Sequence, residues 1–195
     1  MLDCGMPKVD EKFFKLYDWI GFYRHVTDSV PGNMPEARGL SVSISMFIDA
    51  SHGGNVKDCR IQTGVLIFIN KSPIHWYSKK QPSVETRTFG AEFCAMKVGV
   101  EMVEALRYKL RMFGVPLDGA ENVFYDNKAV YKNNVIPEST LRKNHHSIVY
   151  HKFWEAAADK KIRVANQGKL KNLADLFTKV LTAEIRRYLL DRFTY

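Results

Sequence analysis

The feature that most constrains the fold is a change in hydrophobic periodicity close to residue 90. Before it, residues 41–49 alternate between apolar and polar positions, residues 61–69 are rich in β-branched side chains, and a third short run covers 74–78. These runs are typical of β-strands, and their short connections predict an antiparallel meander. From Glu92 to Met112 the apolar residues are spaced by three and four, which predicts a long helix that ends near Gly114.

The rest of the chain alternates short strands with helices. We expect a strand at residues 122–125, a helix from Ser139 or Thr140 to about Lys160, and a strand at residues 162–165. Asn172 is a suitable N-cap for a last helix over residues 173–181. Strands that are linked through helices pair in parallel, so the whole order predicts an α/β fold with a mixed, five-stranded sheet and helices on its faces.

Residues 1–40 differ from this pattern. A helix is expected at residues 11–26, and the segment that follows contains Pro31, Gly32, Pro35 and Gly39, which interrupt regular structure. We therefore expect a linker segment over residues 1–40, a compact domain over residues 41–182 and a helical extension over residues 183–195.

The charge balance points to anionic partners. The chain carries 29 basic and 21 acidic residues, a net charge of +8, and residues 101–195 hold 17 of the basic and 11 of the acidic ones. The positive charge therefore belongs mainly to the second half. Nucleic acid is the first partner to consider, although a charge that serves only solubility is an equal alternative.

Cysteine content and hydropathy exclude several classes of protein. The three cysteines lack Cys-x-x-Cys spacing, which argues against a zinc site and against a secreted disulfide framework. The first residues contain no apolar leader, and the longest apolar run, Val65–Ile69, is too short to cross a bilayer. We expect an intracellular protein, of the cytoplasm or the nucleus, that is neither secreted nor bound to a membrane.

Four acidic residues stand at the ends of predicted elements, and they are Asp49, Glu92, Asp126 and Asp175. Ligands of open α/β sheets bind at the carboxyl ends of strands, where Asp49 and Asp126 would meet if their strands are neighbours. Clustered carboxylates repel one another, and Mg²⁺, which prefers oxygen ligands, would neutralise them. Two such ions can activate a water molecule and stabilise the leaving oxygen of a phosphodiester displacement.

Each of these acids also has an ordinary explanation when it is taken alone. Asp49 and Asp126 fit as polar residues that end strands. Glu92, which opens the predicted long helix, and Asp175, in the first turn of the last one, complement the positive end of a helix dipole. The metal site is a hypothesis that depends on all four acids occurring together.

The local sequence around the acids is more informative than their spacing. The relevant segments are Phe47-Ile-Asp-Ala-Ser-His-Gly-Gly54, Trp76-Tyr-Ser-Lys-Lys-Gln81, Thr88-Phe-Gly-Ala-Glu-Phe-Cys-Ala-Met96, Phe124-Tyr-Asp-Asn-Lys-Ala-Val130 and Asn172-Leu-Ala-Asp-Leu-Phe-Thr-Lys179. In this order, over about residues 44–182, the chain closely resembles the ribonuclease H domain of copia-type LTR retrotransposon polyproteins.

The resemblance implies a five-stranded mixed sheet in the order 3-2-1-4-5 and hydrolysis of the RNA strand of an RNA–DNA hybrid. It assigns Asp49, Glu92, Asp126 and Asp175 as catalytic and metal-binding residues for two Mg²⁺ ions, with Mn²⁺ as an alternative. Asp49 would bridge both ions. Glu92 and Asp126 would share the ion near the attacking water, and Asp175 would hold the other. In that family a reverse transcriptase precedes this domain, so residues 1–40 are similar to the tail of its connecting segment, and the polymerase is an expected partner.

The hybrid would be contacted mainly by the basic second half of the chain. The expected nucleic-acid contacts are Asn127, Arg142, Lys143, His145, Lys169 and Lys171; for the loop lysines and the histidine, a solvated surface position is the alternative. Ser51 stands where the family often has a second Asp. Two other functions therefore stay open: a catalytically silent remnant that still binds nucleic acid, and a host-adopted interaction module that keeps only the fold.

Overall fold

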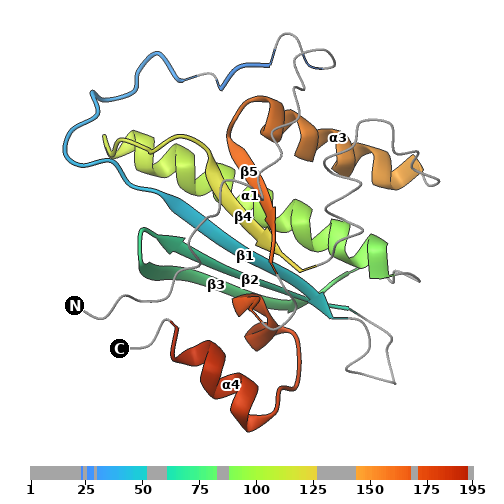
Figure 1. The fold of residues 1–195 in the computed structure, drawn as a ribbon. Coiled ribbons are helices and arrows are strands. Elements are labelled where there is room, and N and C mark those ends of the chain that lie inside the picture. The colour runs from blue at the N-terminus through green and yellow to red at the C-terminus, as the bar shows by residue number, and fades with distance from the viewer. Residues whose placement is uncertain are drawn as a thin grey trace.

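The computed structural model describes residue 23 and residues 26–28, 30–51, 61–82, 88–126, 144–167 and 171–192. Its elements in chain order are β1 (Ile44–Ser51), β2 (Gln62–Ile69), β3 (Ser72–Lys80), α1 (Thr88–Met112), β4 (Glu121–Tyr125), α3 (Asn144–Ala158), β5 (Ile162–Asn166), the 3₁₀ segment η3 (Leu173–Phe177) and α4 (Ala183–Leu190). Figure 1 shows the strands as one twisted sheet with helices on both sides.

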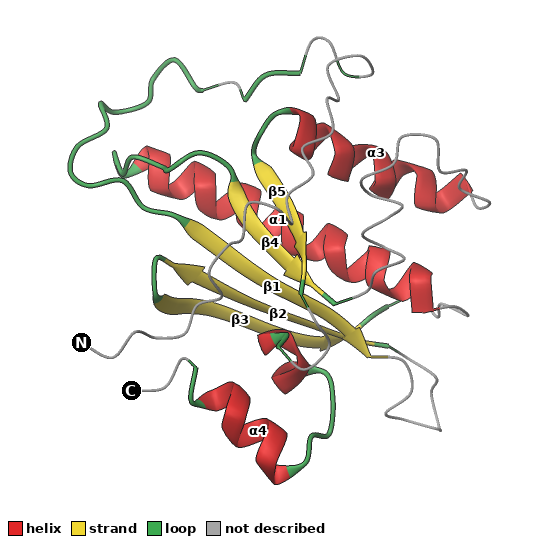
Figure 2. Ribbon diagram, viewed as in Figure 1, coloured by secondary structure: helices red, strands yellow, loops and turns green. Residues whose placement is uncertain are grey.

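The five strands form a single mixed sheet in the order β3-β2-β1-β4-β5. β1, β2 and β3 pair antiparallel, whereas β4 lies parallel to β1 and β5 lies parallel to β4. The change from hairpins to helix-linked strands therefore falls between β3 and β4 (Figure 2). This arrangement confirms the expected mixed α/β sheet and its strand order.

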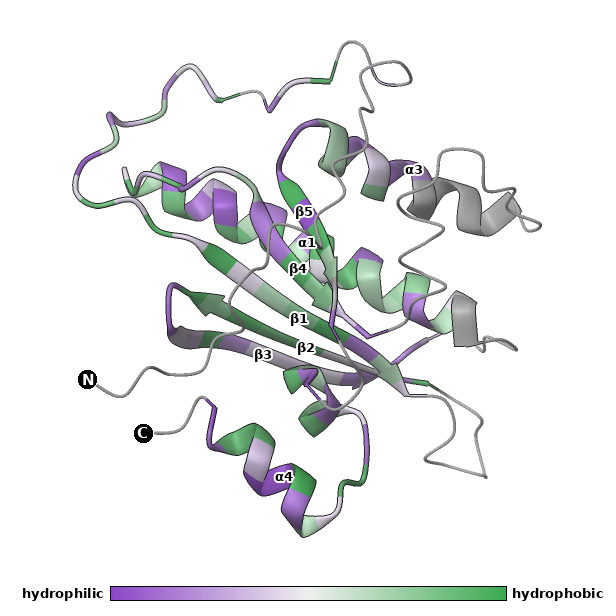
Figure 3. Ribbon diagram, viewed as in Figure 1, coloured by the Kyte–Doolittle hydropathy of each residue, from purple (hydrophilic) through white to green (hydrophobic). Residues whose placement is uncertain are grey.

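The two faces of the sheet are covered by different parts of the chain. α1 and α3 pack on one face, against alternate residues of β1 such as Met46 and Ile48. η3 and α4 pack on the other face, where Phe47 stacks on Phe124 with ring centroids 4.9 Å apart. β2 is hydrophobic from Val65 to Ile69 and α4 carries both kinds of residue, in agreement with a buried strand and a surface helix (Figure 3).

Two predicted boundaries next to the acids differ from the structure. β1 continues past Asp49 to Ser51, so Asp49 does not end the strand. α1 begins at Thr88, which places Glu92 in its second turn and not at its opening. Packing explains the early start, because Ala91 and Phe93 are fully buried against the sheet and hold this part of the chain helical.

The predicted last helix is divided in the structure. Asn172 caps η3, as its sequence position indicated, but η3 ends at Phe177 and α4 starts only after Thr182, which is its own N-cap. Val180, which lies within the predicted helix, is fully exposed between them. The predicted helix at residues 11–26 and the start of the helix at 139 or 140 fall outside the described residues.

A segment before the sheet is attached to α1 by buried charges. The Asp28 carboxylate accepts hydrogen bonds from Arg107 (Nη2–Oδ2 3.0 Å) and from Arg111 (Nη1–Oδ1 2.9 Å). Arg107 also pairs with Glu121, whose carboxylate accepts a hydrogen bond from the backbone N–H of Ile44 at 3.0 Å. Residue 28 is therefore connected through two side chains to the first residue of β1.

We predict that Asp28→Asn destabilises the fold by about 1–3 kcal/mol, because it removes one partner of a largely buried ion pair. Burial alone would raise the pKa of Asp28, but Arg111 and Arg107 outweigh it and hold that pKa below the ordinary 3.8. Its contribution is thus present above the ordinary pKa and is lost as pH falls through the lowered one. Urea denaturation at several pH values measures both effects.

Glu36→Gln is the matched control, because Glu36 pairs with Arg38 on the surface, where their side chains are 84% and 86% exposed. Exposed pairs contribute little, so its unfolding free energy should equal that of the wild type. An equal loss in both variants would contradict the prediction.

Candidate metal centre

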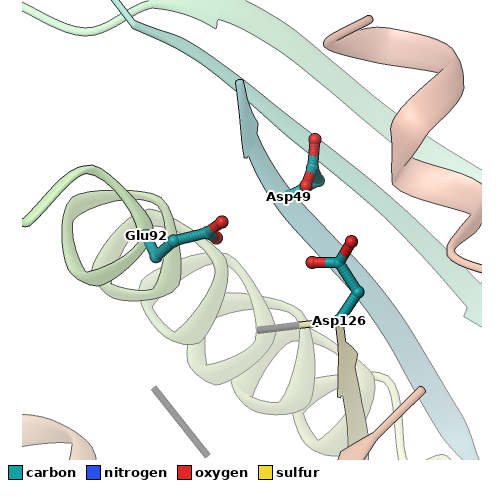
Figure 4. Close-up of side chains that lie close together, drawn as sticks. All are labelled: Asp49, Glu92 and Asp126. Atoms are coloured by element: carbon teal, nitrogen blue, oxygen red, sulfur yellow. The ribbon is translucent and has the colours of Figure 1, made fainter. Parts of the chain in front are cut away.

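Three of the four predicted acids converge at one edge of the sheet. Asp49, Glu92 and Asp126 each offer one carboxylate oxygen, and these oxygens all lie within 4.8 Å of one another. Figure 4 shows the three side chains pointing toward a common space from β1, from α1 and from the end of β4. Asp49 is 1% exposed and Glu92 is 7% exposed, so the cluster is largely screened from water.

The sheet topology brings Asp49 and Asp126 together. β1 and β4 are parallel neighbours, and their register pairs Phe47 with Phe124. Asp49 and Asp126 each lie two residues further on, at the same edge of the sheet. The switch from antiparallel to parallel pairing thus creates the site, as expected for a ligand site in an open α/β sheet.

Asp175 reaches the cluster from the opposite face, through Lys179. The Lys179 Nζ atom lies 2.7 Å from Asp175 Oδ1, 3.1 Å from Asp49 Oδ1 and 3.8 Å from Asp126 Oδ2. Thr178, the residue before it, donates a hydrogen bond from Oγ1 to the other oxygen of Asp49. The structure therefore brings all four predicted acids into one charged group, of which Lys179 is a member.

The position of η3 depends on hydrogen bonds to two strands, β1 and β3. The buried Asn172 side chain donates to the carbonyl of Ile48 in β1 at 2.8 Å and accepts from the N–H of Ala174 at 3.1 Å. From β3, Ser78 donates its hydroxyl hydrogen to the Phe177 carbonyl at 2.7 Å. These contacts fix both ends of η3 and, with them, the direction of Asp175.

Close packing against β2 completes this arrangement. Gly64 is paired with Asp49 in the β1–β2 register and lies directly beneath η3. A Cβ atom at Gly64 would lie 2.6 Å from Thr178 Cγ2 and 2.9 Å from the Ala174 carbonyl oxygen. Only glycine leaves room for η3 at this distance from the sheet.

Gln81 is a positioning residue that the sequence did not reveal. It directly follows β3, a strand at the edge of the sheet, yet it is only 4% exposed. Its amide nitrogen donates to Thr63 Oγ1 at 2.9 Å and to the Ala91 carbonyl at 2.8 Å. Gln81 thus connects β2 to the first turn of α1, one residue before Glu92.

The electrostatics of the cluster reflect burial and mutual repulsion. Burial raises the pKa of Asp175 to about 6; Lys179 opposes this rise, and the charges of Asp49 and Asp126 add to it. Burial alone would lower the pKa of Lys179, but the charges of Asp49, Asp175 and Asp126 outweigh it and raise that pKa well above its ordinary value. Lys179 is therefore charged across the physiological range.

The donor set suits a hard divalent cation. All the converging groups are carboxylates, which Mg²⁺ and Mn²⁺ favour, and neither Cys nor His is among the three residues whose oxygens meet. Asp49, Glu92 and Asp126 would hold the first ion. The carboxylates that the sequence singled out as metal ligands therefore lie together among the described residues.

The predicted nucleic-acid contacts are only partly described. Lys171 is exposed just before η3. His145 is the second residue of α3. Asn127, Arg142, Lys143 and Lys169 fall outside the described residues. These six residues therefore remain predictions.

Comparison with solved structures identifies the fold. The ribonuclease H1 LC11, isolated from compost, matches with a TM-score of 0.54 and 18% sequence identity over 70% of this chain and 92% of that one. The N-terminal ribonuclease H domain of Rv2228c from Mycobacterium tuberculosis matches with a TM-score of 0.52 and 14% identity, over 76% and 99% of the two chains. The fold is thus that of ribonuclease H, with the strand order expected for it.

Sequence comparison gives the relatives. Retrovirus-related Pol polyproteins from the transposons RE2 and RE1 of Arabidopsis thaliana are 24% and 25% identical over 145 residues, or 74% of this chain. The chain spans about a tenth of the length of these relatives, and no family model matches it. Homologues of the chain are therefore retrovirus-related Pol polyproteins, in agreement with the ribonuclease H domain of a copia-type polyprotein that the motifs indicated.

Within the described residues, no helix has the length and apolar character to cross a bilayer.

We predict that Gly64→Ala destabilises the protein by about 1–3 kcal/mol, since the added methyl group displaces η3 from the sheet. The same displacement should weaken Mn²⁺ binding, because Thr178 contacts Asp49 directly. Thermal denaturation and Mn²⁺ titration measure the two effects. Gly32→Ala is the control, because nothing lies within 4 Å of a Cβ atom there; if both substitutions behave alike, close packing at Gly64 is not what positions η3.

We also predict a pH-dependent gain in stability for Asp175→Asn in the absence of divalent ions. With its pKa raised to about 6 from an ordinary 3.8, Asp175 binds a proton more tightly in the native state than in the unfolded chain. Its contribution to stability is therefore lost as pH rises through that range. Between about pH 4 and about pH 7 the unfolding free energy of the variant should rise by roughly 2–3 kcal/mol relative to wild type.

Urea denaturation in chelator at both pH values measures this difference. Asp118→Asn, at an exposed loop residue, is the control and should show no such rise. A constant difference between wild type and Asp175→Asn would show that Asp175 has an ordinary pKa in the fold.

Proposed function

We propose that this protein is a divalent-metal-dependent endonuclease that hydrolyses the RNA strand of RNA–DNA hybrids, as part of the reverse transcription of a retrotransposon. The observation that carries the proposal is the convergence of Asp49, Glu92 and Asp126 within 4.8 Å at the carboxyl edge of the sheet. A buried group of carboxylates is costly without a cation, which favours a metal-binding function over a structural one.

The fold and the relatives support the same chemistry. A crystal structure of LC11 ribonuclease H1 in complex with an RNA/DNA hybrid matches this chain with a TM-score of 0.50 and 20% identity over 70% of the chain. The relatives in sequence are Pol polyproteins. An RNA–DNA hybrid is therefore the proposed substrate, and the reverse transcriptase of the same polyprotein is the proposed partner.

In this proposal the acids have separate tasks. Bound Mg²⁺ or Mn²⁺ would activate the attacking water and stabilise the leaving oxygen of the phosphodiester. Asp49 has the central position, since β1 lies between β2 and β4. The Asp49 carboxylate lies close to those of Glu92 and Asp126 and also contacts Lys179. Asp175, on the opposite face, would serve the second of two ions, as the family resemblance implies.

The chain's own residues would keep the acids in place. Asn172 and Ser78 hold η3 against the strands, and Gln81 connects β2 to the turn of α1 that precedes Glu92. Such preorganisation lets the carboxylates receive ions without rearranging. Asn127, Arg142, Lys143, His145, Lys169 and Lys171 are the proposed contacts to the phosphates and sugars of the hybrid, in the cytoplasm or the nucleus.

The test is cleavage of a labelled RNA–DNA hybrid by the purified full chain in Mg²⁺ and in Mn²⁺. Asp126→Asn should reduce cleavage by about 10²-fold or more, because it removes a charged ligand from the cluster while the backbone stays in place. Asp118→Asn removes an acid of the same type from an exposed loop and should leave the rate unchanged.

Folded wild type that binds the hybrid but does not cleave it would instead indicate a silent nucleic-acid-binding remnant. Failure to bind the hybrid even at low salt would indicate an interaction module that keeps only the fold. Equal cleavage by wild type and Asp126→Asn would contradict the metal site.

A further inference from the structure

A lysine lies within the acidic cluster of this protein. Lys179 Nζ is 2.7 Å from an oxygen of Asp175, 3.1 Å from one of Asp49 and 3.8 Å from one of Asp126. These three carboxylates come from η3, from β1 and from the end of β4. One ammonium group thus connects acids of two neighbouring strands with the acid of η3.

The local backbone holds Lys179 in this position. Its N–H donates to the Asp175 carbonyl at 3.0 Å, so lysine and aspartate lie on the same turn of chain. η3 is in turn fixed by Asn172 and by its contact with Gly64. Lys179 therefore needs little further ordering to meet the acids, and its side chain is 34% exposed whereas that of Asp49 is 1% exposed.

The ammonium group occupies the position that the family resemblance implies for a second ion. Asp49 and Asp175 are the two acids that the resemblance assigns to that ion, and Lys179 contacts both. Carboxylate oxygens of Asp49, Glu92 and Asp126 also converge, within 4.8 Å of one another. The ammonium group shares Asp49 and Asp126 with this group of three, and it lies closest to Asp175, the acid outside the group.

Charge balance favours a single divalent ion while Lys179 stays in place. With all four carboxylates ionised, one ammonium and one divalent ion leave the group with a single negative charge. A second divalent ion would turn that into a net positive charge unless Lys179 moved away. In a site this buried, such a change is costly.

We propose that Lys179 is a built-in cation that competes with the second divalent ion, so that the free protein binds one ion at Asp49, Glu92 and Asp126. The inference deepens the proposed metal-dependent function and rests on it. A second ion binds between Asp49 and Asp175 only when it displaces the ammonium group. Lys179 is a positioning residue in this scheme, since it sets how many ions the acids accept.

The test is Mn²⁺ binding to the full chain without nucleic acid, measured by calorimetry and by the electron paramagnetic resonance signal of free Mn²⁺. Wild type should bind one ion, with a second site weaker by about tenfold or more. Lys179→Met keeps the length of the side chain and removes its charge. This variant should bind two ions, the second at least about tenfold more tightly than wild type binds it.

Lys109→Met is the matched control, because Lys109 is exposed on the last turn of α1 and the substitution changes the net charge by the same amount. Its binding curve should equal that of wild type. Lys179→Met combined with Asp175→Asn should return to one ion, because the second site then lacks its carboxylate.

Wild type that binds two ions of similar affinity overturns the proposal, whether or not the variants fold. Unchanged second-site affinity in a folded Lys179→Met also overturns it. These outcomes are separate from failure of the proposed nuclease function: a protein that cleaves no hybrid can still show the change from one ion to two, and a protein that binds no Mn²⁺ at all contradicts both.

Discussion

Repulsion among four carboxylates is the constraint on which the rest of this structure depends. A parallel pair of strands brings Asp49 and Asp126 to one edge, a helix on one face adds Glu92, and a 3₁₀ segment on the other face adds Asp175. Without cations these groups oppose folding, since burial strengthens their mutual repulsion. The local architecture can be understood as the means of holding them together: strand pairing for the first two, helix packing for the third and a lysine for the fourth.

That architecture relies on close approach more than on the number of contacts. Gly64 lets η3 lie directly on β2, and Gly99 lets α1 lie on β1, where an added Cβ atom would be 2.5 Å from Ile48 Cδ1. The two glycines are on elements that serve opposite faces of the sheet. η3 and α1 can therefore approach opposite faces of the sheet closely, and each carries one of the acids, Asp175 and Glu92.

The sequence predicted the framework well because periodicity reports burial. Alternation over residues 41–49 and helical spacing after Glu92 predicted the mixed sheet. Asp49 and Asp126 were expected to meet if their strands were neighbours, which the parallel pairing of β1 and β4 makes them. Boundaries were less predictable, because packing of Ala91 and Phe93 extends α1 and the exposed Val180 lies where η3 and α4 separate. The sequence did not reveal Gln81, because its side chain donates a hydrogen bond to the Ala91 carbonyl of α1. Such a contact between two elements leaves no periodic pattern in the sequence. In the sequence Lys179 stood out only as part of a motif, since two of the three acids that it contacts, Asp49 and Asp126, are far from it along the chain.

The charged connection from Asp28 through Arg107 to Glu121 has a consequence for how the chain can be divided. Composition marks a boundary near residue 41, just after the segment that contains Pro31, Gly32, Pro35 and Gly39. A fragment cut there would keep Arg107 and Arg111 but lose the carboxylate that both contact. Arg107 also pairs with Glu121, whose carboxylate accepts a hydrogen bond from the N–H of Ile44. The loss would therefore weaken the contacts at the start of β1, the strand that carries Asp49. A fragment that keeps both arginines paired therefore has to begin at or before residue 28.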